Sequence, residues 1–195
     1  VTFPAGHMPF FFRSLELLPV PKRAAAQAEI REAKAARANP DWLMHAGYGL
    51  MFHWTSQTMP RSGPQMKYVD AANAFNVSAF ADMVKKTGAS YIVFTANHVN
   101  PHFPAPLKEW EAVHPGWATK RDLIREIADA LNTRGIKLIL YIHVQSMADP
   151  TWKNDHRTVI NGTRFAYTAI KLISEVGNRY GTRVAAYWFD SFGDI

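Results

Sequence analysis

Four short apolar runs, each ending in a polar residue, constrain the fold of this sequence more than any other feature. Near-continuous apolar runs of strand length are typical of parallel strands that are covered on both faces. We therefore expect four parallel strands near residues 47–53, 90–97, 136–143 and 184–190, in that spatial order. The runs themselves are Tyr48–Trp54, Tyr91–His98, Ile136–His143 and Val184–Asp190.

Helical patterns separate these runs, and each pattern stops at a glycine shortly before the next run begins. The stops are Gly88, Gly135 and Gly181. Glycine commonly ends helices because it adopts the left-handed backbone conformation without strain. The repeated strand–helix unit predicts an α/β fold of the (β/α)8 TIM-barrel type, with helices on one side of the sheet. Residues 119–122 resemble a capping box at the start of one of these helices.

The length of the chain bounds how much of a barrel it can form. The chain has 195 residues, whereas a complete barrel typically needs about 250. We expect residues 47–195 to form about the first four βα units, which is the first half of a barrel catalytic domain. Residues 1–46 read as an irregular N-terminal segment with a surface helix. Because a half barrel leaves two strand edges open, we expect a fragment of a longer protein, or else a chain that pairs with another.

The polar residues that end the runs form the candidate site. They are His53, His98, His143 and Asp190. In a barrel of parallel strands the carboxyl ends of the strands converge on one face, and that face carries the chemistry. Three imidazoles and one carboxylate delivered there by four strands predict an active site. The alternative is coincidence, since strand ends meet water and carry polar residues for that reason alone.

Composition excludes several classes of function. The formal charge is +6, but Lys and Arg are scattered and form no compact basic run, so we expect no nucleic-acid partner. No apolar stretch reaches the ~18 residues of a membrane helix, so we expect no membrane insertion. The absence of cysteine excludes disulfides and thiolate chemistry.

Several segments, in the right order, resemble the α-L-fucosidases of glycoside hydrolase family 29. Residues 42–54 are similar to that family's opening strand, which carries a Phe-Gly-x-Phe-x-His-Trp-Gly signature. Residues 92–98 follow its Thr-x-Lys-His-His pattern, and residues 121–123 and 135–141 match its next helix and strand. Trp188-Phe-Asp190 matches the strand-four motif that holds the nucleophile. The resemblance covers residues 42–190.

The resemblance implies a retaining glycosidase acting on terminal fucose or a related sugar of a glycan. Asp190 is then the implied catalytic nucleophile, and His53 and His98 are the implied ligands of sugar hydroxyls. Trp54 sits at the matching pocket-wall position, and His143 is a further candidate for substrate binding. We expect no cofactor and no metal. The resemblance to this family favours a secreted or periplasmic location.

The sequence departs from the family pattern at the sugar face. The second histidine of the family's pair is Val99 here, the preceding Lys is Asn97, and the Gly after His53-Trp54 is Thr55. His143 stands where the family usually has Ser. The family's acid/base carboxylate lies downstream of strand four, beyond Ile195. Other carboxylates are available but do not match that motif, so we assign no acid/base; they are Glu109, Glu111 and Asp194.

Two other functions fit the same residues. The first is a metal-dependent barrel hydrolase or isomerase, because mixed His and carboxylate sites suit Zn or Mn. The strand-end residues His53, His98, His143 and Asp190 would then be ligands. The second is a catalytically inactive glycan-binding fragment, because this chain lacks a matched acid/base.

Overall fold

The computed structural model divides by its internal contacts into two units, residues 1–42 and residues 43–195. The boundary expected after residue 46 stays a prediction. The residues that the structure describes are 20–36, 38–55, 62–98, 100–147 and 159–191.

The first unit contains helix α1, Val20–Ala36. Its sequence is dominated by Ala, Glu, Lys and Arg, which have high intrinsic helix propensity. Its described side chains are mostly exposed, and Ile30 is 55% exposed. A short helix, α2, spans Asp41–Met44.

The second unit is built on a four-stranded parallel sheet in the order β1-β2-β3-β4. This confirms the predicted α/β fold, in which parallel strands alternate with helices. The strands are slightly shorter than predicted, because pairing starts later in β4 and stops earlier in β2. Their bounds are Gly49–Phe52 for β1, Tyr91–Thr95 for β2, Lys137–His143 for β3 and Ala186–Asp190 for β4.

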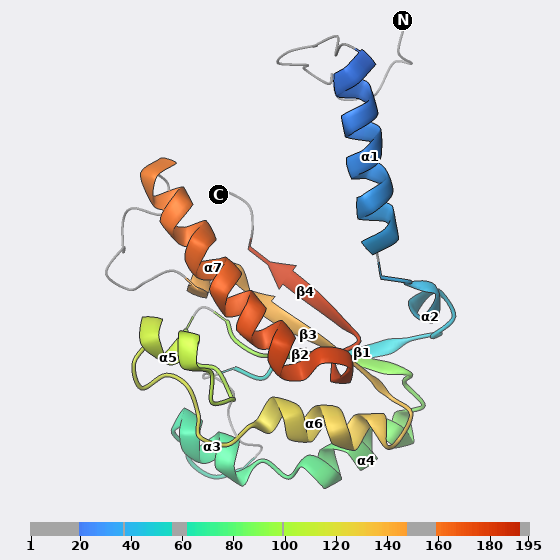
Figure 1. Cartoon of the computed structure of the whole chain (residues 1–195). Helices are drawn as coiled ribbons and strands as arrows, with labels where there is room; N and C mark the ends of the chain where they lie inside the picture. Colours follow the sequence, from blue (N-terminus) through green and yellow to red (C-terminus); the bar gives the residue numbers. More distant parts are fainter. Residues whose placement is uncertain (1–19, 37, 56–61, 99, 148–158, 192–195) are drawn as a thin grey trace, which may run out of the picture. The chain divides into compact units, whose positions relative to one another are not determined.

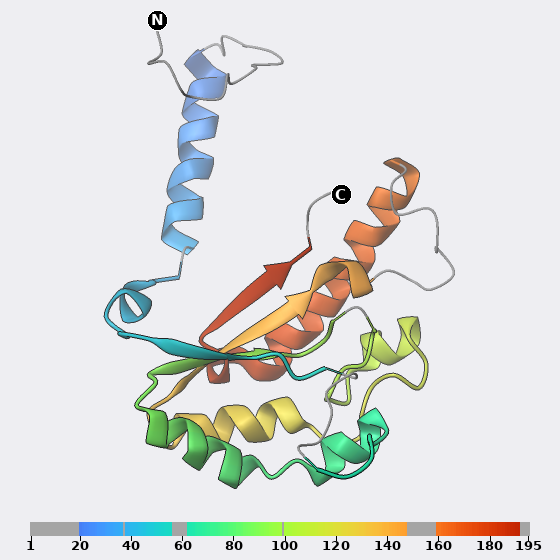
Figure 2. The ribbon, with the colours of Figure 1, turned by 180° about the vertical axis from the view of Figure 1, so that it is seen from behind.

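Three helices pack on one face of this sheet, as the sequence predicted. They are α4 (Val77–Thr87), α6 (Leu123–Asn132) and α7 (Val159–Tyr180). Figure 1 shows α7 crossing in front of the strands, and Figure 2 shows the strands in front of α7. The core lies between these layers, where alternate strand residues such as Ile92, Phe94 and Leu140 are fully buried. Burial of this apolar surface is the main stabilising contribution.

The other face of the sheet carries no helix among the described residues (Figure 2). Alternation along a strand sends every second side chain to this face. Met51 and Trp188 lie on it and are 50% and 51% exposed. In a closed barrel this face would be the interior, which is filled by side chains from other strands.

Local sequence signals explain where the helices begin and end. Gly88 ends α4 with a φ of 81°, which glycine adopts without strain. Asn76 caps the start of α4 by accepting the amide of Ala79 at 3.0 Å. The capping-box interpretation of residues 119–122 is wrong in detail, because Asp122 is itself the N-cap of α6. Its carboxylate accepts the amide of Arg125 at 3.1 Å.

The long loops after the strands contain short helices that the sequence analysis did not predict. Arg121 holds the helix at residues 68–74 in place, because its guanidinium donates to the carbonyls of Ala72, Asn73 and Phe75 at the end of that helix. These short helices are α3 (Tyr68–Ala74), α5 (Lys108–Val113) and the 3-10 turn η1 (Val144–Met147), and a further 3-10 turn, η3 (Gly181–Arg183), joins α7 to β4.

Candidate functional site

Asp190 is the last residue of β4, and its carboxylate is held by two hydrogen-bond donors. The Tyr141 hydroxyl on the neighbouring strand donates to Oδ2, and the backbone amide of Ser191 also donates to the carboxylate. Both bonds favour the ionised form, and the bond from Tyr141 is the larger cause of a lowered Asp190 pKa. Burial and the same carboxylate raise the pKa of Tyr141, which therefore stays protonated. The arrangement presents a fixed, ionised carboxylate at a strand end.

The three strand-end histidines lie together beside this carboxylate. The rings of His53 and His98 have centroids 4.4 Å apart, and those of His98 and His143 are 5.0 Å apart. The Tyr141 ring lies 6.0 Å from His53 and 6.3 Å from His98. The structure thus brings the four strand-end residues into one group around Tyr141. We call His53, His98, Tyr141, His143 and Asp190 the strand-end cluster.

Burial keeps two of these imidazoles neutral. The pKa of His98 is lowered chiefly by burial and further by His53, while Asp190 opposes the shift. The pKa of His143 is lowered in the same way, by burial first and then by His98. A neutral imidazole offers one donor and one acceptor. Both rings are therefore in the form suited to binding hydroxyl groups.

His98 reaches the cluster because β2 ends before it. Strand alternation places Thr95 on the same face as the cluster, where its hydroxyl lies 3.4 Å from His53 Nδ1. Continued alternation would send His98 to the helix face with Ala96, which is in the core. The strand stops at Thr95 instead, and the His98 ring contacts His53 and His143. The sequence pattern could not show this change of direction.

Asn97 has a structural role that the sequence pattern did not indicate. Its side-chain Nδ2 donates to the carbonyl of His143 at 2.9 Å, and its Oδ1 accepts the amide of His143 at 3.2 Å. The same Nδ2 contacts the Ser146 hydroxyl, which in turn donates to the His143 carbonyl at 2.8 Å. The amide side chain therefore continues the pairing of β2 with β3 beyond the point where the backbone ladder ends.

Trp54 lies apart from the strand-end cluster in the contacts that the structure describes. Its ring packs against Tyr68 at 5.1 Å, Phe75 at 5.8 Å and Phe94 at 6.1 Å, which are centroid separations. Phe94 belongs to the buried core. These contacts are those of a residue that anchors the end of β1 to the core. A role for Trp54 in a sugar-binding wall stays a prediction.

Tyr141 and Ser191 are further members of the site that the sequence analysis did not single out. Tyr141 precedes His143 by two positions in β3, so alternation places both on one face. That spacing was the available signal. Ser191 follows Asp190 directly, and its hydroxyl lies 3.0 Å from His143 Nε2. No sequence pattern indicated that contact.

Two of the three carboxylates available for an acid/base role bind groups away from Asp190. Glu111 accepts the amides of Gly116 at 2.6 Å and Ala118 at 3.3 Å. Glu109 lies 4.0 Å from the ammonium of Lys171 on α7. Asp194 lies outside the described residues. Neither Glu109 nor Glu111 contacts Asp190 among the described residues, so no acid/base is assigned.

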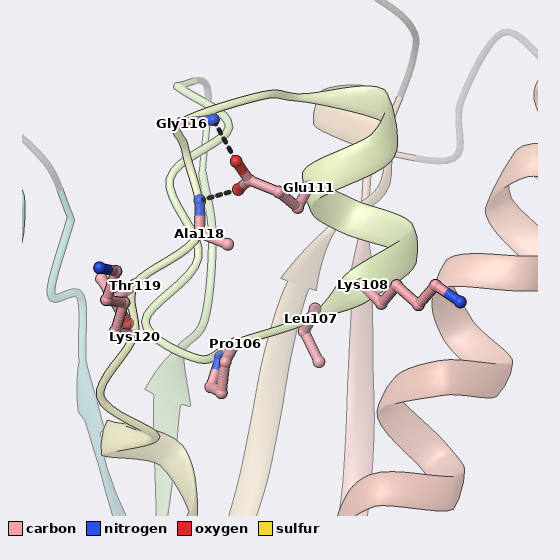
Figure 3. Close-up of a pocket in the computed structure, with 8 residues that line it drawn as sticks. All are labelled: Pro106, Leu107, Lys108, Glu111, Gly116, Ala118, Thr119 and Lys120. Atoms are coloured by element: carbon pink, nitrogen blue, oxygen red, sulfur yellow. Dashed lines mark hydrogen bonds between the residues drawn. The ribbon is translucent and has the colours of Figure 1, made fainter.

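A pocket of about 490 Å³ lies in the loop between β2 and α6, away from the residues of the strand-end cluster. Figure 3 shows Glu111 pointing across it to Gly116 and Ala118, while Lys108 points away from that carboxylate. Its one carboxylate therefore closes the loop by binding backbone amides. The lining residues indicate loop structure rather than a reaction centre; they are Pro106, Leu107, Lys108, Glu111, Gly116, Ala118, Thr119 and Lys120.

The described ranges contain neither a metal-binding cluster nor a membrane-spanning helix. No group of three or more His, Asp or Glu side chains there is arranged so that it could hold a metal ion. The metal-dependent alternative thus gains no support from the geometry of these residues. In the same part of the chain, no helix is long and apolar enough to cross a membrane.

The fold and the strand-end cluster define part of a (β/α)8-barrel catalytic domain. The alpha-L-fucosidase family profile matches residues 63–194, which is more than half of the chain. The chain belongs to this family, glycoside hydrolase family 29. It is 26% identical to plasma alpha-L-fucosidase of Homo sapiens over 198 residues, covering 83% of this chain and 41% of the relative.

Solved structures show the same fold. An alpha-L-fucosidase GH29 from Bacteroides thetaiotaomicron superposes with a TM-score of 0.56 at 19% identity, covering 79% of this chain and 41% of that one. The Thermotoga maritima alpha-fucosidase in complex with fucose gives a TM-score of 0.59 at 18% identity, covering 82% of this chain and 48% of that one. The chain spans about two fifths of the length of the curated relatives it matches.

Proposed function

We propose that this chain carries the nucleophile of a retaining glycosidase that hydrolyses an α-L-fucoside or a related sugar. The observation that carries the proposal is the Asp190 carboxylate, which Tyr141 and the Ser191 amide hold in its ionised form at the end of β4. Membership of the alpha-L-fucosidase family supports the choice of substrate class.

The chemistry needs a carboxylate in this state. In a retaining glycosidase one carboxylate attacks the anomeric carbon and forms a covalent glycosyl-enzyme intermediate. A second carboxyl group, about 5–5.5 Å away, first protonates the leaving oxygen and then activates water. Asp190 would supply the first role. By resemblance to the family, the second group would come from sequence downstream of β4.

The histidines beside Asp190 would bind the sugar. His53 and His98 are proposed as ligands of its hydroxyl groups, because a neutral imidazole both donates and accepts a hydrogen bond. The lowered pKa of His98 keeps that ring neutral near pH 7. The rings of His53 and His98 are in contact, so they would bind neighbouring hydroxyl groups of one sugar ring.

Replacement of the proposed nucleophile tests the function. In the full-length protein, Asp190→Ala should lower kcat for an aryl α-L-fucoside by orders of magnitude, because covalent catalysis is lost. Azide or formate should restore part of the turnover by occupying the vacated space. Asp82→Ala is the matched control, since Asp82 is 54% exposed on α4 and pairs with Arg134 in the turn after α6.

Three outcomes would contradict the proposal. They are near-normal turnover of Asp190→Ala, inverted configuration of the released sugar, and loss of activity on adding a chelator. The first would assign the wrong carboxylate, the second the wrong mechanism, and the third would favour the metal-dependent alternative.

A further inference from the structure

Ser191 has an unusual backbone conformation for a serine. Its φ is 61°, and it is the one non-glycine residue with a positive φ among those that the structure describes. Residues with a Cβ atom seldom adopt this left-handed backbone conformation, because the Cβ approaches the following carbonyl. Such strain persists only where the surroundings impose it, and it concentrates at functional sites. The residue that follows the proposed nucleophile is therefore held in place by its contacts.

Those contacts join Ser191 to both neighbouring side chains of the cluster. Its amide donates to the Asp190 carboxylate, and its hydroxyl lies 3.0 Å from His143 Nε2. Asp190 and His143 are themselves register partners on β4 and β3. Ser191 thus bridges the two strand ends with one backbone bond and one side-chain bond.

His143 has no nitrogen left with which to bind a substrate. Its Nε2 faces Ser191, and its Nδ1 is buried without a hydrogen-bond partner among the described residues. The whole residue is only 7% exposed, and Asn97 fixes its backbone amide and carbonyl. Ser191, by contrast, is partly exposed. The accessible polar group at this point of the site is the serine hydroxyl.

The burial of Nδ1 also selects the tautomer of the ring. A proton on Nδ1 would be a buried donor without an acceptor, which costs more than a buried, unpaired acceptor. The proton therefore belongs on Nε2, which donates to the Ser191 oxygen. The hydroxyl proton of Ser191 is then free to be donated outward.

We propose that Ser191, oriented by His143, is a substrate-binding residue that donates a hydrogen bond to a hydroxyl of the sugar bound beside Asp190. His143 is then a positioning residue and not a sugar ligand. This inference rests on the proposed glycosidase function. This proposal accounts for the strained backbone of Ser191. The left-handed conformation directs the amide of Ser191 to Asp190 and its hydroxyl to His143.

The His143–Ser191 bond can be tested in the 195-residue chain without any activity. Long-range ¹H–¹⁵N NMR should show His143 as the Nε2–H tautomer at pH 7.5. Ser191→Ala should shift its Nε2 resonance and change its titration, whereas Ser174→Ala on α7 should not. Ser191→Gly should lose the same bond while raising the melting temperature above that of Ser191→Ala, because glycine relieves the strain. An Nε2 signal unchanged by Ser191→Ala, or an Nδ1–H tautomer, would overturn the inference.

The contact with substrate is tested in the full-length protein. Ser191→Ala and Ser191→Gly should each lower kcat/KM for an aryl α-L-fucoside roughly tenfold, the size of one lost hydrogen bond. A deoxy-fucoside lacking the contacted hydroxyl should lose about as much on the wild type and nothing further on Ser191→Ala. Unchanged kcat/KM in both variants would refute the contact. A wild-type protein inactive on every fucoside would refute the proposed function instead, and the NMR result would still decide the His143–Ser191 bond.

Discussion

The Tyr141 hydroxyl donates a hydrogen bond to the Asp190 carboxylate across two neighbouring parallel strands. β3 and β4 are in register, with Tyr141 opposite Trp188 and His143 opposite Asp190. The tyrosine side chain therefore reaches one step diagonally, which is within range for an aromatic residue on a sheet. This bond is the leading reason for the lowered pKa of Asp190.

Tyr141→Phe should raise the pKa of Asp190 toward its usual value, because a donor to the ionised form is removed. The acidic limb of the kcat/KM profile of the full-length protein should then move to higher pH. The loss at the optimum should be roughly tenfold to a hundredfold, the size expected for a hydrogen bond to a charged group. Tyr167→Phe is the matched control, since Tyr167 is 63% exposed on α7. An acidic limb that does not move would contradict this assignment.

The stability of the chain should fall as the pH drops below about 6.5, the ordinary pKa of histidine. The native pKa values of His98 and His143 are lowered, so the unfolded chain binds protons more readily than the folded chain. Protonation therefore favours unfolding, and stability is lost as the pH falls from the unfolded pKa toward the lowered native ones. Asp190 has a lowered pKa too, and its contribution is lost only at more acidic pH.

Urea midpoints measured between pH 8 and pH 5 would test this dependence. His98→Gln and His143→Gln should each flatten the curve. His45→Gln should leave it unchanged, because His45 is exposed and outside the strand-end cluster. Equal slopes in all the variants would show that these imidazoles do not control the acid sensitivity.

Asn97→Ala should destabilise the second unit by about 1–3 kcal/mol, the cost of leaving buried polar groups unsatisfied. The side chain pairs with both the amide and the carbonyl of His143, and Asn97 is only 3% exposed. Asn132→Ala is a suitable comparison, because Asn132 is exposed and its side chain donates to the carbonyl of Arg183 at 3.2 Å. It should change stability by less than ~0.5 kcal/mol. Equal effects of the two substitutions on the urea midpoint would argue against a stabilising role for the hydrogen bonds between Asn97 and the backbone of His143.

Gly49→Ala should also be destabilising, by about 1–3 kcal/mol, through overpacking. A Cβ at this position would lie 2.2 Å from the ring of Tyr91, its register partner on β2. Gly177→Ala in α7 meets nothing within 4 Å, and there the better helix propensity of alanine should stabilise by roughly 0.5–1 kcal/mol. Thermal unfolding of the two variants should shift in opposite directions. A shift of the same sign in both would refute the packing argument.

The sheet was predictable because its signals are local. Four apolar runs of strand length, three of them preceded by a helix that stops at a glycine such as Gly88, place β2 and its neighbours without reference to the rest of the chain. The parallel order then follows from the repeated strand–helix unit. The short helices α3 and α5 lack such signals, because they have few residues and are held by distant groups such as Arg121.

The strand-end residues were predictable in position but not in their partners. Strand ends place His53, His143 and Asp190 at one edge, and this much follows from period-two alternation. The bond between Tyr141 and Asp190, by contrast, depends on the relative register of β3 and β4, which no local pattern encodes. The same holds for Ser191, whose bond to His143 joins residues far apart in the sequence.

The all-parallel order of the sheet has a consequence for how this chain folds. Each strand pairs only with strands separated from it by a helix and a long loop. Every strand pairing therefore joins residues that are far apart in the sequence. Folding dominated by such non-local pairings is slow. Among the four described strands β4 is the most distant along the chain from β1, and it pairs with β3 alone. The carboxylate of Asp190 therefore reaches Tyr141 only once β4 has paired with β3, so the bond between these two side chains reports on that pairing.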